Sequence, residues 1–137
     1  MSGEWPLSHR LILAALPEAV PTARANIKAL LLGWDLTALT EPAELCVTEL
    51  VSNAIKAVHR LHPDLRHPIA LRVSSDRSRL LMEVWDCSPE LPKKAQPDGQ
   101  SENGRGLVLI EAYSDRWSFY ATPQWGGKVV WCVIEAS

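Results

Sequence analysis

The residues best suited to chemistry begin with Glu49 and Asn53, whose i, i+4 spacing stacks a carboxylate and a carboxamide one turn apart on a helix. Asn offers a neutral oxygen ligand and Glu a proton acceptor, so the pair can hold a hard cation and a water together. Lys56 and Arg60 continue the same polar line. Considered alone, such a line is more often a solvated helix face.

Three further groups follow along the chain. Asp86 ends an apolar run, where its carboxylate can accept a hydrogen bond from an exocyclic amine or simply cap a turn. Gly104-Arg105-Gly106 begins a helical pattern, and unobstructed backbone N–H groups at the positive end of a helix suit a phosphate chain, although a plain loop-to-helix junction has the same pattern. Gly126-Gly127-Lys128 precedes the last apolar run. The functional signal lies in the combination and order of these groups.

Helices are predicted over residues 22–33, from 40 to about 61, and from Gly104 through Tyr113. In the second, Thr40 is the predicted N-cap and Pro42 lies in the first turn. The side opposite Glu49 is apolar and predicts burial against a sheet; it comprises Val47, Leu50, Val51, Ala54, Val58 and Leu61.

Apolar runs bounded by turn residues predict strands over 9–16, 69–73, 80–85, 116–121 and 128–135. Residues 88–103 are rich in proline and polar residues without apolar periodicity, which predicts a long lid or binding loop. The order predicts an α+β fold, a two-layer sandwich in which a mostly antiparallel five-stranded sheet carries three helices on one face. One domain is expected over residues 1–137.

The composition argues against several classes of partner. The 137 residues carry a formal net charge of −2, so no basic surface for nucleic acid is expected. The apolar runs are shorter than the ~20 residues of a membrane-spanning helix, and the N-terminus lacks the layout of a signal peptide. These features predict a cytoplasmic protein without a membrane partner.

Cysteine and histidine usage predicts neither disulfides nor a transition-metal site. Cys46, Cys87 and Cys132 are odd in number and widely separated, which fits a reducing compartment. The histidines at 59, 62 and 67 lie at a helix end and in a proline-flanked loop, without cysteine or carboxylate partners at metal-site spacing. We therefore expect these histidines to be structural.

Two segments resemble the motifs of a known family. Thr48-Glu49-Leu50-Val51-Ser52-Asn53-Ala54 and Gly104-Arg105-Gly106-Leu107 are similar to motifs of the histidine-kinase-like (GHKL-type) ATPase domain, which gyrase, sensor kinases and mismatch-repair ATPases share. The similarity runs from Ala23-Arg24 to Trp131 and is greatest to the stand-alone anti-sigma-factor serine kinases and the short actinobacterial ATP-binding regulatory proteins.

The resemblance implies ATP or ADP and Mg²⁺ as cofactors. Asn53 would be the metal ligand, Glu49 the general base, and Asp86 the acceptor for the adenine amino group. The other residues assigned to nucleotide binding are Lys56, Gly104, Arg105, Gly106, Leu107 and Lys128.

The resemblance also implies a function: a serine/threonine kinase acting as an anti-sigma factor in a partner-switching system. Its partners would be a sigma factor and an antagonist of the anti-sigma factor, and a homodimer is possible. An alternative is a nucleotide-sensing or degenerate, non-catalytic interaction module of the same fold. It is motivated by Ser88, where the family usually has Gly, and by Val129, where a Thr hydroxyl commonly supports the adenine-binding Asp. The catalytic part of a sensor kinase is disfavoured because no phospho-acceptor domain precedes residue 9.

Overall fold

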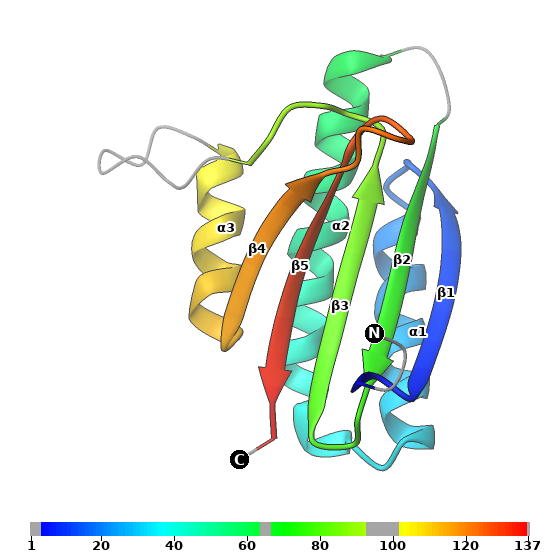
Figure 1. The fold of residues 1–137 in the computed structure, drawn as a ribbon, viewed down its shortest axis with the longest axis vertical. Coiled ribbons are helices and arrows are strands. Elements are labelled where there is room, and N and C mark those ends of the chain that lie inside the picture. The colour runs from blue at the N-terminus through cyan, green and yellow to red at the C-terminus, as the bar shows by residue number, and fades with distance from the viewer. Residues whose placement is uncertain (1–3, 64–66, 93–101, 137) are drawn as a thin grey trace.

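The computed structural model describes residues 4–63, 67–92 and 102–136, with residues 102–106 described by their backbone alone. One five-stranded sheet is covered by helices on one face (Figure 1). The strands are β1 (Leu7–Ala14), β2 (Pro68–Ser75), β3 (Arg79–Asp86), β4 (Arg116–Ala121) and β5 (Lys128–Glu135). The helices are α1 (Ala19–Gly33), the short 3₁₀ helix η2 (Thr37–Leu39), α2 (Thr40–Leu61) and α3 (Glu102–Tyr113). The predicted α+β fold class is confirmed.

The strand order is β1-β2-β3-β5-β4, and every neighbouring pair is antiparallel. Side chains alternate between the two faces, so Leu80, Met82 and Val84 of β3 point toward the helices and are buried. Asp86 continues this alternation at the end of β3. The register pairs it with Lys128, the first residue of β5. The sheet therefore places both charged side chains on the helix-covered face, at one end.

Helix α2 buries its predicted stripe against the sheet, and Val47, Leu50 and Val58 are among its most buried side chains. Leu61 is 45% exposed, so its predicted burial is wrong. It is the last residue of α2, in the part of the helix that extends past the strands (Figure 1).

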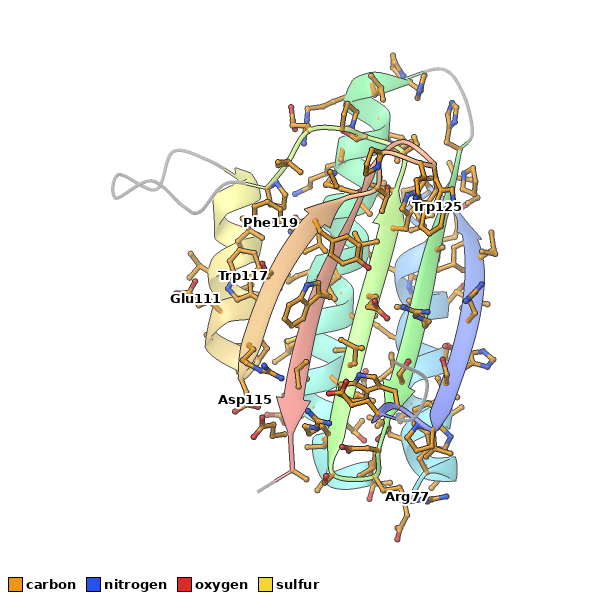
Figure 2. The ribbon with its side chains drawn as sticks, viewed as in Figure 1. Arg77, Glu111, Asp115, Trp117, Phe119 and Trp125 are labelled. Carbon is orange, nitrogen blue, oxygen red and sulfur yellow. The ribbon has the colours of Figure 1, made fainter. Side chains whose placement is uncertain are left out.

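Helix α3 lies on the same face as α1 and α2, beside α2 and toward the sheet edge formed by β4. Trp117 and Phe119 of β4 pack against the core, and Trp117 Nε1 donates to Glu111 Oε2 of α3 at 3.3 Å (Figure 2). Two buried side chains of α3, Leu107 and Ile110, complete this packing. Helix α3 is thereby fixed beside α2 and β4.

Several predicted boundaries differ from the observed ones, and three of the differences have an identifiable cause. Strand β1 lies two residues earlier than predicted, because Ala15 N donates to His67 O and Leu16 N donates to Ala14 O, which turns the chain away. Helix α1 begins three residues earlier than predicted, with Pro21 in its first turn, where a missing N–H breaks no helical bond. The predicted N-cap at Thr40 is wrong, because η2 leads straight into α2 and makes Thr40 its first residue.

The predicted lid over 88–103 is described only in part. Residues 88–92 leave β3 as irregular chain, residues 93–101 lie outside the described part, and α3 already begins at Glu102.

The turn between β4 and β5 makes one unusually close approach to β3. Gly127 has a φ of +84°, and a Cβ there would lie 2.0 Å from the carbonyl oxygen of Asp86. Gly127→Ala is therefore expected to lower the free energy of unfolding by at least about 1–3 kcal/mol, measured by urea denaturation. Gly33→Ala is the control, because Gly33 ends α1 in open space and the change should stabilise by up to about 1 kcal/mol. The same urea midpoint for Gly127→Ala and the unmodified chain would show that position 127 accepts a Cβ without strain.

Candidate functional site

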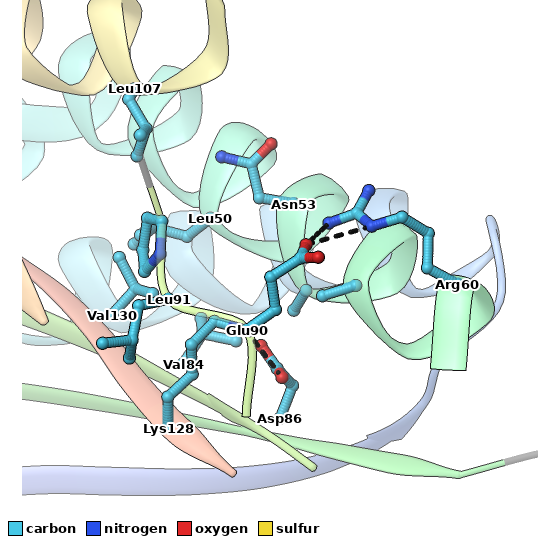
Figure 3. Close-up of a pocket in the computed structure, with 13 residues that line it drawn as sticks. Leu50, Asn53, Arg60, Val84, Asp86, Glu90, Leu91, Leu107, Lys128 and Val130 are labelled. Carbon is cyan, nitrogen blue, oxygen red and sulfur yellow. Dashed lines mark hydrogen bonds and ion pairs between the residues drawn. The ribbon is translucent and has the colours of Figure 1, made fainter. Parts of the chain in front are cut away.

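A cavity of about 330 Å³ lies between α2, the ends of β3 and β5, and the start of the loop that follows β3 (Figure 3). Its size lies within the usual range of small-molecule sites. Helix α2 contributes Leu50, Asn53, Ala54, Ala57 and Arg60; the sheet contributes Val84, Asp86, Lys128 and Val130; the loop contributes Glu90, Leu91 and Pro92; and α3 contributes Leu107. Apolar walls with a few polar groups at the ends are typical of a site for a flat organic ring.

One end of the cavity is formed by Asn53, which lines it from α2 (Figure 3). Its carboxamide makes no hydrogen bond to any residue in the described part of the chain, so the oxygen can bind a ligand. Glu49 lies one turn earlier on the same helix, half-buried, and is not among the cavity-lining residues. The pair thus places a ligand oxygen inside the cavity and a carboxylate beyond it.

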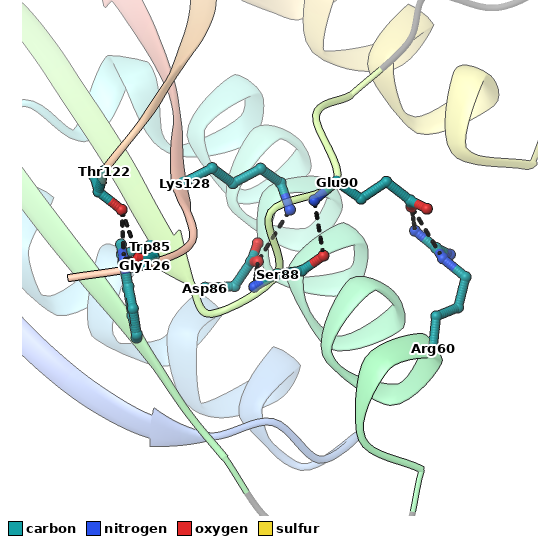
Figure 4. Close-up of polar contacts among 8 residues, drawn as sticks. All are labelled: Arg60, Trp85, Asp86, Ser88, Glu90, Thr122, Gly126 and Lys128. Atoms are coloured by element: carbon teal, nitrogen blue, oxygen red, sulfur yellow. Dashed lines mark hydrogen bonds and ion pairs between the residues drawn. The ribbon is translucent and has the colours of Figure 1, made fainter. Parts of the chain in front are cut away.

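The other end contains a buried ion pair. Lys128 Nζ donates to Asp86 Oδ1 at 3.0 Å, and Ser88 N donates to the same oxygen at 2.8 Å (Figure 4). Asp86 is 1% exposed and Lys128 4%. Burial raises the pKa of Asp86, and the charge and hydrogen bond of Lys128 and the Ser88 N–H oppose that rise only in part. The carboxylate that the sequence assigned to an adenine amine therefore already accepts two hydrogen bonds.

The resemblance implies that the residue at position 129 supports Asp86, but the structure places Val129 on the other face of the sheet. Val129 points to the opposite face of the sheet, where it lines a different depression with Trp85 and Tyr120. Because side chains alternate along β5, Lys128 and not Val129 stands beside Asp86. A hydroxyl at position 129 would thus lie outside the site, and the group that pairs with Asp86 is the ammonium of Lys128.

Ser88, the second departure, is used by the loop itself. Its hydroxyl oxygen accepts a hydrogen bond from Glu90 N at 3.2 Å (Figure 4). Glu90 Oε1 in turn accepts from Arg60 Nε at 3.1 Å and Nη2 at 2.6 Å, which ties the loop to α2 at the rim of the cavity. Both side chains are about half exposed, so the ion pair stabilises by at most about 1 kcal/mol.

Lys56, assigned to the nucleotide from the sequence, is exposed and is not among the residues that line the cavity. Arg60, one turn further along α2, is the cation at the rim. The sequence identified Arg60 only as part of a polar line, and it did not assign Glu90, Leu91 or Pro92. The helical spacing of Arg60 from Asn53 is enough to identify it as a candidate site residue, whereas no local pattern marks the loop residues.

The glycine motif lies in the first turns of α3. This helix begins at Glu102, so Gly104-Arg105-Gly106 occupies its third to fifth positions. Helix N-termini expose N–H groups that have no partner within the helix, which suits an anion. Leu107 follows directly, is buried and lines the cavity. The backbone of the motif is therefore brought next to the cavity.

The fold and the site together define a class: a two-layer α+β domain whose cavity lies between one long helix and the ends of two central strands. The family model described as the histidine kinase-like ATPase domain matches residues 13–134. The chain belongs to this family. A comparison with curated proteins found no match. No helix in the described ranges is long and apolar enough to cross a membrane.

The residues that line the cavity fit Mg²⁺ well and fit the amino group of a base only in part. Mg²⁺ takes oxygen ligands and is usually held by few protein groups together with phosphates and waters, so the unengaged Asn53 oxygen fits one position. Ala57, Val84 and Val130 line the cavity with apolar surface that a base could contact. Asp86 fits an amino group only in part, because Lys128 and Ser88 already bind its Oδ1.

Proposed function

We propose that this protein is an ATP- and Mg²⁺-dependent serine/threonine protein kinase that acts as an anti-sigma factor in a partner-switching system. The observation that carries the proposal is the free Asn53 carboxamide at one end of a nucleotide-sized cavity that has Asp86 at the other. Membership of the histidine kinase-like ATPase domain family supports ATP as the ligand.

In this proposal each residue has one role. Asn53 holds Mg²⁺, which when bound offsets the negative charge of the phosphates. Glu49 accepts the proton of a serine hydroxyl that the partner protein presents, and its place outside the cavity suits an acceptor that arrives from solvent. Asp86 and Lys128 hold the base, the first as acceptor and the second as donor.

The partners in this proposal are a sigma factor and an antagonist of the anti-sigma factor, and the protein acts as a homodimer. Similarity to the anti-sigma-factor serine kinases supports these assignments. The serine that receives the phosphoryl group belongs to the antagonist.

A second candidate is a nucleotide-sensing or non-catalytic interaction module. The buried Asp86–Lys128 pair favours it, because a carboxylate that is neutralised inside the protein has less to offer an adenine amine. In this case the fold and the partner surface are retained without phosphoryl transfer.

Titration calorimetry with ATP, with and without Mg²⁺, separates the two candidates. The kinase proposal expects micromolar binding that needs Mg²⁺, and expects Asn53→Ala to weaken Mg²⁺-ATP binding at least about tenfold. Asn26→Ala is the matched control, because it deletes a carboxamide from α1, away from the cavity. No heat at millimolar nucleotide would reject the kinase and leave the interaction module. If Mg²⁺-dependent binding is found, incubation with Mg²⁺-ATP and antagonist proteins should yield phosphoserine.

A further inference from the structure

Three side chains that commonly bind transition metals meet at the end of the molecule next to Asp86. His62 follows α2, His67 precedes β2, and Cys87 follows β3. One ligand atom from each lies within 4.8 Å of the other two. The two imidazole rings are stacked, with centroids 3.9 Å apart and planes inclined by 23°. This cluster is separate from the residues that line the nucleotide cavity.

The histidines of the cluster are not explained by internal hydrogen bonds. His67 Nε2 is buried and has no hydrogen-bond partner in the described part of the chain. Leaving a buried polar atom unpaired costs about 1–3 kcal/mol, so such atoms in folded proteins call for a ligand. His59 provides the contrast, because its Nε2 donates to Ala15 O at 2.7 Å and is fully used.

We propose that His62, His67 and Cys87 form a binding site for a divalent transition-metal cation, with Zn²⁺ as the preferred ion. Two imidazole nitrogens and one thiolate are a ligand set typical of Zn²⁺, whereas Mg²⁺ and Ca²⁺ select oxygen ligands. Three protein ligands leave a fourth position for water.

The required rearrangement is small. Tetrahedral Zn²⁺ bonds of about 2.0–2.3 Å place ligand atoms about 3.3–3.6 Å apart, so the three atoms must approach by about 1 Å. The stacked rings of His62 and His67 must also rotate until their lone pairs converge. All three residues lie at the ends of secondary-structure elements, where such rotations leave the sheet ladder intact.

The site joins three elements that are distant in sequence: the end of α2, the start of β2 and the end of β3. Cys87 stands between Asp86 and Ser88, so a bound cation would also fix the backbone that leads into the loop over the nucleotide cavity. The metal site does not depend on the proposed kinase function, and its test needs no nucleotide.

Co²⁺ titration of the reduced, metal-free chain of residues 1–137 tests the site, because Co²⁺ substitutes for Zn²⁺ and reports thiolate ligation by absorption. We expect one equivalent to bind with a thiolate-to-cobalt charge-transfer band, and excess Zn²⁺ to abolish the band. Cys87→Ser should remove the band, and His67→Ala should weaken binding at least about tenfold. Cys46→Ala and His9→Ala are controls for a thiol and an imidazole outside the cluster, and both should bind like the unmodified chain.

A second measurement keeps the proposal testable if a variant folds poorly. In the unmodified chain, Zn²⁺ should strongly reduce iodoacetamide labelling of Cys87, as followed by peptide mass spectrometry, while labelling of an unrelated small thiol in the same tube is unchanged. Co²⁺ binding without a thiolate band, or the same Cys87 labelling rate with and without Zn²⁺, would overturn the site.

Discussion

Replacing Lys128 with methionine is expected to lower the free energy of unfolding by about 3 kcal/mol at pH 8. The substitution keeps most of the length of the side chain and removes its charged terminal group, so the 1% exposed Asp86 carboxylate loses its counter-ion. Removing one partner of a buried ion pair is costly because the remaining charge stays out of water. Urea denaturation of the variant and the unmodified chain measures the loss.

The loss should depend on pH in a definite direction. Burial raises the pKa of Asp86, and without Lys128, whose charge opposes that rise, the pKa of the folded state rises further above the unfolded value of about 3.9. A carboxyl with a raised folded pKa destabilises the fold where it is ionised, so the penalty grows as pH rises through the folded pKa and disappears toward the unfolded value. The deficit of Lys128→Met should therefore be smaller at pH 5 than at pH 8.

Two further variants serve as controls for this prediction. Lys56→Met removes an exposed lysine from α2 and should change stability by no more than about 0.5 kcal/mol. The double variant Asp86→Leu with Lys128→Met replaces the whole pair by apolar side chains and should recover most of the lost stability. A deficit in Lys128→Met that is independent of pH would show that the cost is packing and not an unpaired carboxyl.

Replacing Glu49 with glutamine is expected to lower phosphoserine formation about 100- to 10,000-fold, the usual contribution of a general base. Glutamine keeps the shape of the side chain and cannot take a proton. Because Glu49 lies outside the cavity lining, the Kd for Mg²⁺-ATP should stay unchanged. Phosphate transfer to the antagonist protein and calorimetry on the same preparations measure the two quantities.

Glu41→Gln is the matched control, because it makes the same exchange at an exposed position two turns earlier on α2 and should leave transfer intact. Normal transfer in Glu49→Gln would mean that another group takes the proton. A parallel loss of transfer and Mg²⁺-ATP binding would instead place Glu49 in the metal or nucleotide site.

Local patterns predicted most of the fold. Strands β4 and β5 have the predicted bounds, because apolar runs flank a turn with two glycines at positive φ. The errors lie where a long-range contact decides the boundary, as at Ala15, whose N–H binds His67 O. The predicted N-cap at Thr40 is wrong because a preceding 3₁₀ turn continues into the helix, which composition does not reveal.

The two ends of the candidate site also differ in whether local sequence patterns or long-range contacts determine them. Glu49 and Asn53 share one helix, so their relation follows from spacing alone. The partner of Asp86 depends on the register of β3 against β5, which no local pattern specifies, so the sequence assigned Lys128 to nucleotide binding without predicting its ion pair with Asp86. The approach of Cys87 to His62 and His67 is also a product of tertiary structure, and the prediction of purely structural histidines could not include it.

The antiparallel contact between β3 and β5 has a consequence for how such a protein can diverge. The buried ion pair of Asp86 and Lys128 at one end of the cavity belongs to the sheet, whereas Asn53, Glu49 and the rim cation Arg60 belong to α2. The two sets share no hydrogen bond within the described residues. Under the proposed function, an exchange at position 128 would change the polar group at the sheet end of the cavity while the polar face of α2 keeps its sequence.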